Sequence, residues 1–148
     1  MKKQILIFGA AIVMSSITNA QDIPQSQVPS IINNEFNKQF PKATDVEWER
    51  AGYLYNVEFE INWNQDHEIR YNSEGKIVKH KEDISVSELP KVVNNTIKRK
   101  FNGYSIDDLK RITDNGQIVY KMELNAFTKQ DWDIVIDNNG DVISKIAD

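Results

Sequence analysis

Paired acidic residues are the groups in this sequence whose spacing most readily suggests chemistry. Glu47 and Glu49 stand two apart, as do Glu58 and Glu60, and Glu68 is followed two positions later by Arg70. Residues two apart in a strand share one face of a sheet. General acid–base catalysis would need such carboxylates to have separated pKa values in a pocket, whereas carboxylates on an exposed sheet face are ordinarily solvated. Three interpretations stay open: a solubilising face, a recognition surface for a basic protein or peptide, and an enzyme that uses the glutamates. The same face should include these residues of the second half: Lys121, Glu123, Asp131 and Asp133.

Other catalytic and metal-binding arrangements find less support. The chain has no cysteine, and its two histidines are His67 and His80. A zinc site takes three or four nitrogen or sulfur ligands, and we expect His67 at a strand edge and His80 on a short edge strand. No serine lies in a nucleophile-elbow motif. The segment 137–141, DNNGD, lacks the glycine spacing of an EF-hand loop, and a hairpin turn explains it better. We therefore predict no catalytic residue, no metal and no cofactor.

The first twenty residues have the pattern of a secretory signal peptide. Lys2 and Lys3 precede ten apolar residues, Ile5 to Met14, and small residues lead to Ala20. The apolar run is half the length of about 20 residues that a spanning helix needs, so we predict cleavage after Ala20 rather than a membrane anchor. Because no cysteine follows, lipid attachment at that site is excluded. The expected location is the periplasm or the extracellular space, with no membrane association after cleavage.

The charge balance argues against nucleic acid as a partner. The whole chain carries a net charge of −4, and removal of residues 1–20 would take away two lysines and no acid, which leaves −6. Nucleic-acid binding is favoured by clustered lysine and arginine. An acidic protein is instead suited to a basic protein or peptide.

Two segments repeat each other at a distance of 61 residues. SQVPSIINNEFNKQF, residues 26–40, returns as SELPKVVNNTIKRKF, residues 87–101. In both, apolar residues recur at a spacing of four, which predicts a helix with one apolar face. Ser26 and Ser87 are expected to cap these helices, with Pro29 and Pro90 in the first turn.

Each predicted helix is followed by segments of period two, which is typical of strands. In YLYNVEFEINW, residues 53–63, the aromatic and aliphatic residues from Tyr53 to Trp63 face one way and the polar residues the other. HEIRY and KIVKH continue the first half, and the second half repeats the plan with SIDDLKRI, GQIVYKMELNA, WDIVI and DVISKI. The fold class is therefore α+β, a tandem repeat of one helix packed on a four-stranded antiparallel sheet. Residues 21–84 form the first repeat and residues 85–148 the second.

The order of short motifs resembles a known family. VP opens the first helix, FP ends it, VEWE and YNVEF follow, then a glycine turn, and LP opens the second helix. Over residues 28–146 this is similar to the PepSY-like, β-lactamase-inhibitor-like proteins secreted by Bacteroidetes-type bacteria. The resemblance implies tandem repeats whose sheets form a continuous, concave surface, and a non-enzymatic role. The name-giving inhibitor has a disulfide in each repeat; this chain has none, so β-lactamase inhibition is not implied.

Our leading hypothesis is a secreted or periplasmic binding module without catalysis, which could act as an inhibitor of a protein or peptidase partner. Its predicted binding residues are the acidic set with two rim aromatics, because an exposed aromatic can anchor a partner: Glu47, Glu49, Glu58, Glu60, Glu68, Arg70, Tyr53 and Trp63. The alternative is a small-ligand carrier with a pocket between helix and sheet or between the repeats.

Overall fold

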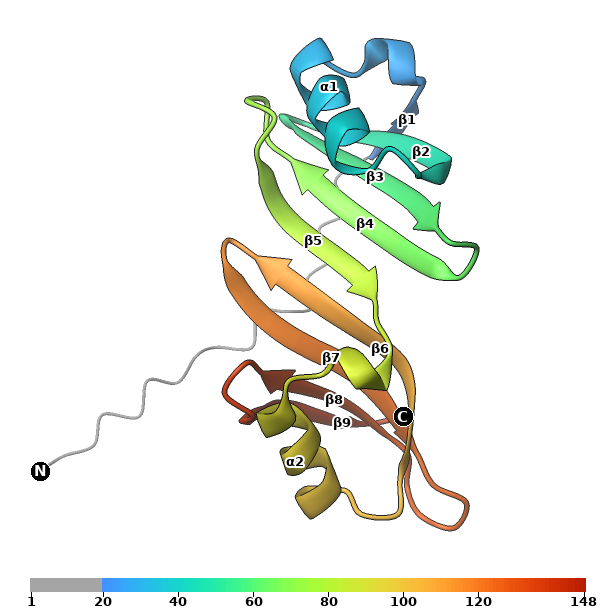
Figure 1. Cartoon of the computed structure of the whole chain (residues 1–148), viewed down its shortest axis with the longest axis vertical. Coiled ribbons are helices and arrows are strands. Elements are labelled where there is room, and N and C mark those ends of the chain that lie inside the picture. The colour runs from blue at the N-terminus through green and yellow to red at the C-terminus, as the bar shows by residue number, and fades with distance from the viewer. Residues whose placement is uncertain (1–19) are drawn as a thin grey trace, which may run out of the picture.

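A computed structural model describes residues 20–148, which form one antiparallel sheet with two helices (Figure 1). The sheet has nine strands, and their spatial order is their order in the sequence, from β1 to β9. Every neighbouring pair is antiparallel, so each connection is a hairpin or passes through a helix. The predicted signal peptide lies outside the described residues, apart from Ala20, and its cleavage stays a prediction. Between residues 20 and 148, no helix is long and apolar enough to cross a membrane.

The elements of the two halves follow the same order, except that the first half has one additional strand. The first half consists of β1 Gln21–Ile23, the 3₁₀ turn η1 Gln25–Gln27, α1 Ser30–Gln39, β2 Thr44–Ala51, β3 Leu54–Ile61, β4 Gln65–Tyr71 and β5 Ile77–Asp83. The second half consists of η2 Val86–Glu88, α2 Lys91–Lys100, β6 Ser105–Asp114, β7 Gln117–Asn125, β8 Trp132–Asp137 and β9 Val142–Ala147.

The two predicted helices are present, but the predicted serine caps are wrong. Pro29 and Pro90 occupy the N-cap positions, and Ser26 lies in the preceding turn η1. Proline restricts the residue before it to extended backbone, which separates each 3₁₀ turn from its α-helix. The serine that does cap is Ser85, which forms a reciprocal capping box with Glu88 around η2.

Each helix packs on the sheet through its apolar face, and this creates two separate cores. Ile32 and Phe36 of α1 are buried against aromatic and aliphatic residues of β2, β3 and β4. Val93 and Ile97 of α2 are buried against β7 and β8. The alternation read from the sequence is confirmed here, since Val57, Ile69, Met122, Leu124, Ile134 and Ile136 are completely buried.

The prediction of two four-stranded sheets is wrong in its count. The short β1 pairs with β2, with Ile23 opposite Trp48, and so adds a strand to the first half. β5 then pairs with β6 along Lys79–Asp83, so the two halves share one continuous sheet. Because β5 is covered on both sides by neighbouring strands, it is no edge strand, contrary to the expectation for His80.

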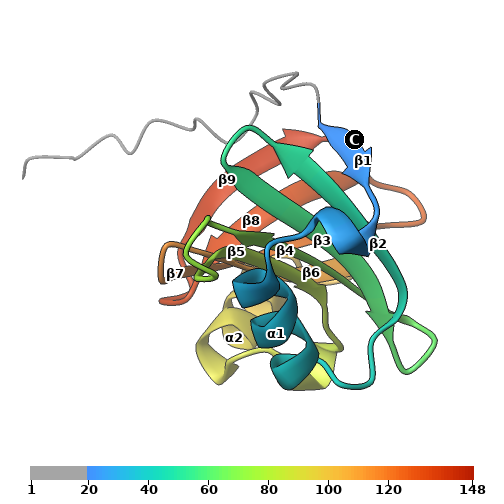
Figure 2. The same ribbon diagram turned by 90° about the horizontal axis from the view of Figure 1, so that it is seen from above.

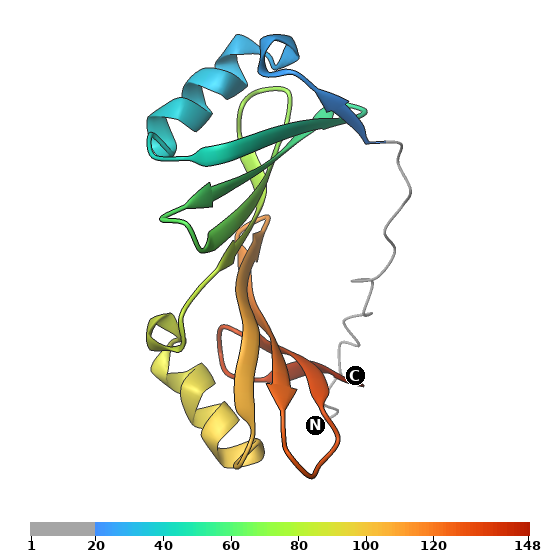
Figure 3. The same ribbon diagram turned by 90° about the vertical axis from the view of Figure 1, so that its right-hand side faces the viewer.

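Both helices lie on the same face of the sheet, and the opposite face is concave (Figures 2 and 3). Sheets twist and coil as strands are added, and bulges increase the bend locally. Register shifts occur at matching places in the halves, between Thr44 and Glu47 in β2 and between Asp107 and Lys110 in β6. The helix-free face is therefore a broad hollow whose walls are the two ends of the sheet.

Two aromatic residues depart from their predicted alternation. Tyr53 and Trp63 were expected on the apolar face, at the ends of their strand, but β3 ends at Ile61. Asn62 and Trp63 both have positive φ in the turn to β4. The side chain of Tyr53 is 86% exposed and that of Trp63 is 91% exposed. The interpretation of these two as rim residues thus fits the structure better than a core role.

Candidate functional site

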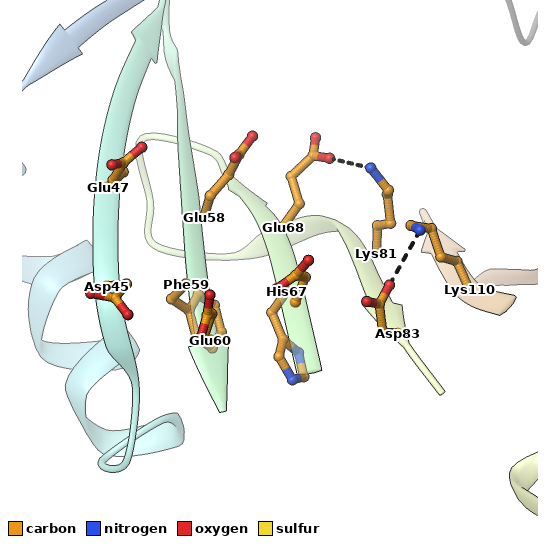
Figure 4. A pocket seen from close by; sticks show the side chains of 11 residues that line it. Asp45, Glu47, Glu58, Phe59, Glu60, His67, Glu68, Lys81, Asp83 and Lys110 are labelled. Atoms are coloured by element: carbon orange, nitrogen blue, oxygen red, sulfur yellow. Dashed lines mark hydrogen bonds and ion pairs between the residues drawn. The ribbon is translucent and has the colours of Figure 1, made fainter. Parts of the chain in front are cut away.

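A row of charged side chains crosses the concave face of the first half (Figure 4). Glu47, Glu58, Glu68 and Lys81 lie on four successive strands, and each is the direct cross-strand partner of the next. Directly opposed residues have Cβ atoms about 5 Å apart. Like charges at that distance repel one another, so only the final pair of the row is electrostatically favourable. That pair is closed by Lys81 Nζ, 3.0 Å from Glu68 Oε2.

This row borders an open hollow of about 360 Å³ in the concave face. The hollow extends from the acidic strands β2, β3 and β4 to the lysines of β5 and β6. It is lined by Asp45, Glu47, Glu58, Phe59, Glu60, Asp66, His67, Glu68, Lys81, Asp83 and Lys110. A second hollow of about 370 Å³ adjoins it near β1 and shares Glu47 and Glu58 with the first. Neither of these two hollows is lined by α1 or α2, so the pocket between helix and sheet that the small-ligand alternative allowed is not among them. The first hollow does extend from the first half to Lys110 of the second, which is the other place that this alternative allowed.

The positive and negative charges of the hollow are unevenly matched. Lys110 Nζ lies 3.4 Å from Asp83 and also contacts Asp108, and Lys81 forms an ion pair with Glu68. Five acids at the other end make no ion pair with any residue of the described chain: Asp45, Glu47, Glu58, Glu60 and Asp66. The hollow therefore has one end with a local excess of negative charge.

Glu58 is at the centre of this excess. Partial burial raises its pKa above the ordinary value, and the neighbouring carboxylates of Glu68 and Glu49 raise it further, although Lys81 acts in the opposite direction. Burial and like charges both disfavour the ionised form. A cation placed beside Glu58 would remove part of this penalty, so the site is electrostatically suited to a positively charged group.

The structure brings some of the predicted binding residues together and leaves others apart. Glu47, Glu58, Glu60 and Glu68 line the first hollow, and Glu49 lines the second. Arg70 donates from Nε to Asn56 Oδ1 at 2.9 Å and lines neither hollow. Tyr53 and Trp63 lie in the turns at opposite ends of β3, also outside both.

The second half contributes less to this surface than its sequence suggests. Lys121 is the cross-strand partner of Lys110, and Glu123 faces Asp133 across β7 and β8. Asp131 accepts a 2.8 Å hydrogen bond from the backbone N–H of Ala126 and thus closes a loop. None of these residues lines the two hollows described above.

Sequence reasoning missed the lysine end of the hollow. Lys81 and Asp83 extend β5 beyond KIVKH, where the predicted strand stopped, although the alternation of charged residues continues through them. Lys110 follows the bulge in β6. Because the bulge shifts the register, simple alternation along the strand does not predict which face of the sheet Lys110 lies on. The alternation over the whole of residues 77–83 would have predicted the full length of this strand.

A second polar group lies on the helix side of the sheet, near the junction of the halves. His67 Nδ1 and His80 Nε2 are 3.1 Å apart, on neighbouring strands β4 and β5. Glu82 Oε1 is 3.9 Å from His80 Nδ1 and accepts a 2.9 Å hydrogen bond from Arg111 of β6. His67 was expected at a strand edge, but it is 93% buried, since its exposed fraction is 7%. The two imidazole rings stack on each other, and the His67 ring also stacks on Phe59.

Burial sets the protonation of the two histidines. Desolvation lowers the pKa of His67 and of His80, and the nearby Glu82 opposes this in both cases. Both imidazoles are therefore biased toward the neutral form, in which each ring has one donor and one acceptor nitrogen.

Comparison with known proteins places this fold in a family. The family described as "Putative beta-lactamase-inhibitor-like, PepSY-like" matches residues 15–79 and again residues 74–144. The chain belongs to this family, as the resemblance in sequence predicted. No match is found among curated proteins.

Solved structures of similar fold come from Bacteroides species. A DUF2874 family protein from Bacteroides uniformis has 19% identity and a TM-score of 0.63, over 80% of this chain and 88% of that one. A BLIP-like protein from Bacteroides fragilis has 17% identity and a TM-score of 0.61, over 84% and 87%. A protein from Bacteroides eggerthii, described in the words "putative periplasmic proteins", has 16% identity and a TM-score of 0.64, over 81% and 88%. At these identities the likeness concerns the fold alone.

Proposed function

We propose that this protein is a non-catalytic binding module that holds a basic segment of a partner protein or peptide in its concave face. The observation that carries the proposal is the set of acids around Glu58 that have no ion-pair partner in the described chain, beside a hollow wide enough for side chains. Like charges opposed across strands destabilise a sheet. A bound lysine or arginine would offset that repulsion and gain charge-assisted hydrogen bonds.

The Lys81–Glu68 pair illustrates how a cation is accommodated on this face. Lys81 reaches across one strand spacing to place its ammonium 3.0 Å from the carboxylate. A partner's cationic side chains could occupy the equivalent positions beside Glu58 and Glu47, one and two strands further along the row. Complementary charge of this kind accelerates association and favours the correct partner more than it raises affinity.

The proposed setting is the periplasm or the extracellular space. It is supported by the predicted signal peptide and by the description of the Bacteroides eggerthii structure. Within that setting, inhibition of a partner enzyme such as a peptidase is the specific role we propose, in keeping with a family named for inhibitor-like proteins. β-Lactamase is not the proposed target, because the disulfides of the name-giving inhibitor have no counterpart in a chain without cysteine.

We also infer that residues 21–84 and 85–148 are two copies of one unit. The family match occurs twice along the chain, and each half has one helix, one buried core and a bulge in the strand after the helix. A single unit of about 60 residues would be only marginally stable. Joining two units through β5 and β6 gives a larger folded domain and a wider concave surface.

The function is tested by binding of a defined lysine- and arginine-rich peptide, followed by NMR of the backbone amides. We expect the amides of β2, β3 and β4 around Glu58 to shift. The variant Glu58→Gln, Glu60→Gln, Glu68→Gln should bind the peptide at least about tenfold more weakly, since each charge-assisted hydrogen bond is worth about 1.5–3 kcal/mol.

A matched control removes three acids elsewhere: Glu35→Gln on α1, Glu74→Gln in the β4–β5 turn and Asp141→Asn in the β8–β9 turn. It changes the net charge by the same amount and should bind as the wild type does. Equal weakening in both variants would reduce the effect to overall charge and contradict a site on the concave face. Inhibition is then examined with partners captured from an envelope extract by wild type and not by the concave-face variant.

A further inference from the structure

The two histidines form a compact nitrogen pair to which the proposed function assigns no role. They point to the helix side of the sheet, with Phe40, whose ring centre is 6.2 Å from that of His67 and 5.9 Å from that of His80. The acidic row occupies the opposite face. Of the pair, His67 also lines the concave hollow, whereas His80 does not.

The separation of the nitrogens suits a shared metal ion. His67 Nδ1 and His80 Nε2 are 3.1 Å apart. Imidazole nitrogens bind first-row ions such as Zn²⁺ at about 2.0–2.1 Å, so two of them on one tetrahedral ion lie roughly 3.3 Å apart. A movement of a few tenths of an ångström would thus open the pair for an ion. A hydrogen bond between the two neutral rings accounts for the same distance, and the experiment below separates the two states.

Glu82 supplies a carboxylate close to the pair. One potential ligand atom from each of His67, His80 and Glu82 lies within 4.8 Å of the other two. Glu82 Oε1 is also 3.9 Å from His80 Nδ1. The carboxylate can therefore serve as a third ligand after a change of rotamer, or accept a hydrogen bond from His80 Nδ1–H and orient the ring, as carboxylates often do beside metal-bound histidines. The 2.9 Å hydrogen bond that Glu82 accepts from Arg111 Nε holds the carboxylate in its present position.

The surroundings hold the ligand side chains in place. The Phe59 ring lies almost parallel to His67, with an interplanar angle of 9° and a centroid distance of 4.9 Å. His67 and His80 are themselves stacked at 26°. A site whose rotamers are fixed by packing loses little entropy when the ion binds.

We propose that His67, His80 and Glu82 form a binding site for a first-row transition metal ion of the Zn²⁺ class, which links β4 to β5 beside the junction of the two halves. Imidazole nitrogen with one carboxylate favours zinc, copper or nickel, whereas calcium and magnesium prefer oxygen ligands alone. No metal site was predicted from the sequence, because His67 was expected at a strand edge and His80 on a short edge strand.

The test is calorimetric titration of the untagged full chain with Zn²⁺, and in parallel with Mg²⁺. We expect one Zn²⁺ per chain, no response to Mg²⁺, and a higher melting temperature with Zn²⁺ because the ion binds the folded state. His80→Phe retains a ring against Phe40 and should abolish binding. Glu82→Gln should weaken binding about 10–100-fold. Glu58→Gln, on the opposite face, should leave zinc binding unchanged.

Two results would overturn the proposal: no Zn²⁺ binding by wild type, or equal binding by wild type and His80→Phe. If His80→Phe fails to fold, paramagnetic Cu²⁺ added to the wild type gives the answer. Selective broadening of the NMR signals of Phe40, Phe59 and Arg111 would support the site. Broadening confined to other regions, or none, would refute it and leave the two histidines as a hydrogen-bonded pair.

Discussion

The hydroxyl of Thr96 donates a 2.8 Å hydrogen bond to the backbone carbonyl of Gly140, which joins α2 to the turn between β8 and β9. The two residues are 44 positions apart, and both are buried. The equivalent turn of the first half makes a similar close approach, since a Cβ built on Gly75 would lie 3.2 Å from the Ile31 side chain of α1. In both halves, a glycine lets the helix contact the last hairpin of its own half.

Replacement of Gly140 should therefore destabilise the protein strongly. A Cβ at this position would be 2.9 Å from Val92 Cγ2 and 3.1 Å from Val92 O, and the backbone has φ +88°. Gly116 has almost the same φ, +85°, with no atom within 4 Å of its Cβ position. Gly140→Ala and Gly116→Ala both carry the backbone cost, of about 1 kcal/mol or more. We expect Gly140→Ala to lose about 1–3 kcal/mol beyond Gly116→Ala through overpacking. Urea unfolding measures this, and equal losses would show that the helix can move aside.

The hydrogen bond itself is tested by Thr96→Val. Valine has nearly the same shape but cannot donate, so the carbonyl of Gly140 would stay buried and unpaired. Such a loss costs about 1–3 kcal/mol. Thr44→Val is the control, because Thr44 is exposed and its bond to Glu60 O is long, at 3.4 Å. A loss at Thr96 no greater than that at Thr44 would mean that water replaces the hydroxyl.

The raised pKa of Glu58 predicts how the effect of its substitution on stability depends on pH. An acid whose pKa is raised in the folded state stabilises that state at pH below the ordinary value of 4.5, and this contribution is lost as pH rises through the raised value. Glu58→Gln should therefore be more stable than wild type at pH 7, with the difference disappearing at pH below 4.5. Melting temperatures across this range measure it, with Glu74→Gln in an exposed turn as the control. A wild type that is the more stable at pH 7 would contradict repulsion on this face.

Tyr71 offers a test at alkaline pH. Its hydroxyl is buried without a hydrogen-bond partner in the described chain, and burial raises its pKa to about 12. The stability linked to this group is present below its ordinary value of 10.0 and is lost as pH rises through about 12. Tyr71→Phe should gain about 1 kcal/mol at neutral pH and resist alkaline unfolding. Tyr120→Phe is the comparison, since it loses a 3.3 Å hydrogen bond to Asn138. A loss of stability in Tyr71→Phe would indicate a bound water at the hydroxyl.

Substitution of Trp63 can distinguish a role of this residue in binding from a role in folding. Its side chain is 91% exposed and its φ is +69°, a region that favours glycine. Trp63→Gly should therefore keep or raise the stability, by up to about 1 kcal/mol. If Trp63 anchors the partner, the same variant should lose about 2 kcal/mol or more of binding energy. Unchanged affinity for a captured partner would remove Trp63 from the binding surface.

Binding of a basic peptide should depend strongly on salt. The acids around Glu58 are exposed or half-exposed, so added salt screens them over distances of about 10 Å or less. We expect the association rate to fall at least about tenfold between low and high ionic strength, with a smaller change in the dissociation rate. Stopped-flow fluorescence measures both rates. A salt-independent association rate would argue that apolar contacts, and not the glutamates, attract the partner.

Local pattern was enough to predict the helices, most strands and the direction of their faces. The spacing of Ile32 and Phe36 by four residues defines a helical face, and the alternation of Val57 and Phe59 with Glu58 and Glu60 defines a strand with one wet side. These are properties of the chain over one or two turns or pleats, so they are readable wherever they occur. The acidic composition of the concave face was determined in the same way.

Only the tertiary structure determined which strands pair with one another and in which register. The pairing of β5 with β6 is a long-range contact, formed where the last strand of the first half meets the first strand after α2. That pairing removed an edge from each half, brought Lys110 beside Asp83, and placed Arg111 against Glu82. The approach of His67 to His80 depends likewise on the register between β4 and β5, and a shift by one residue would turn one of the two to the opposite face. Alternation gives the face of each residue, but register gives its neighbour, and register is fixed by packing and turns across the whole sheet.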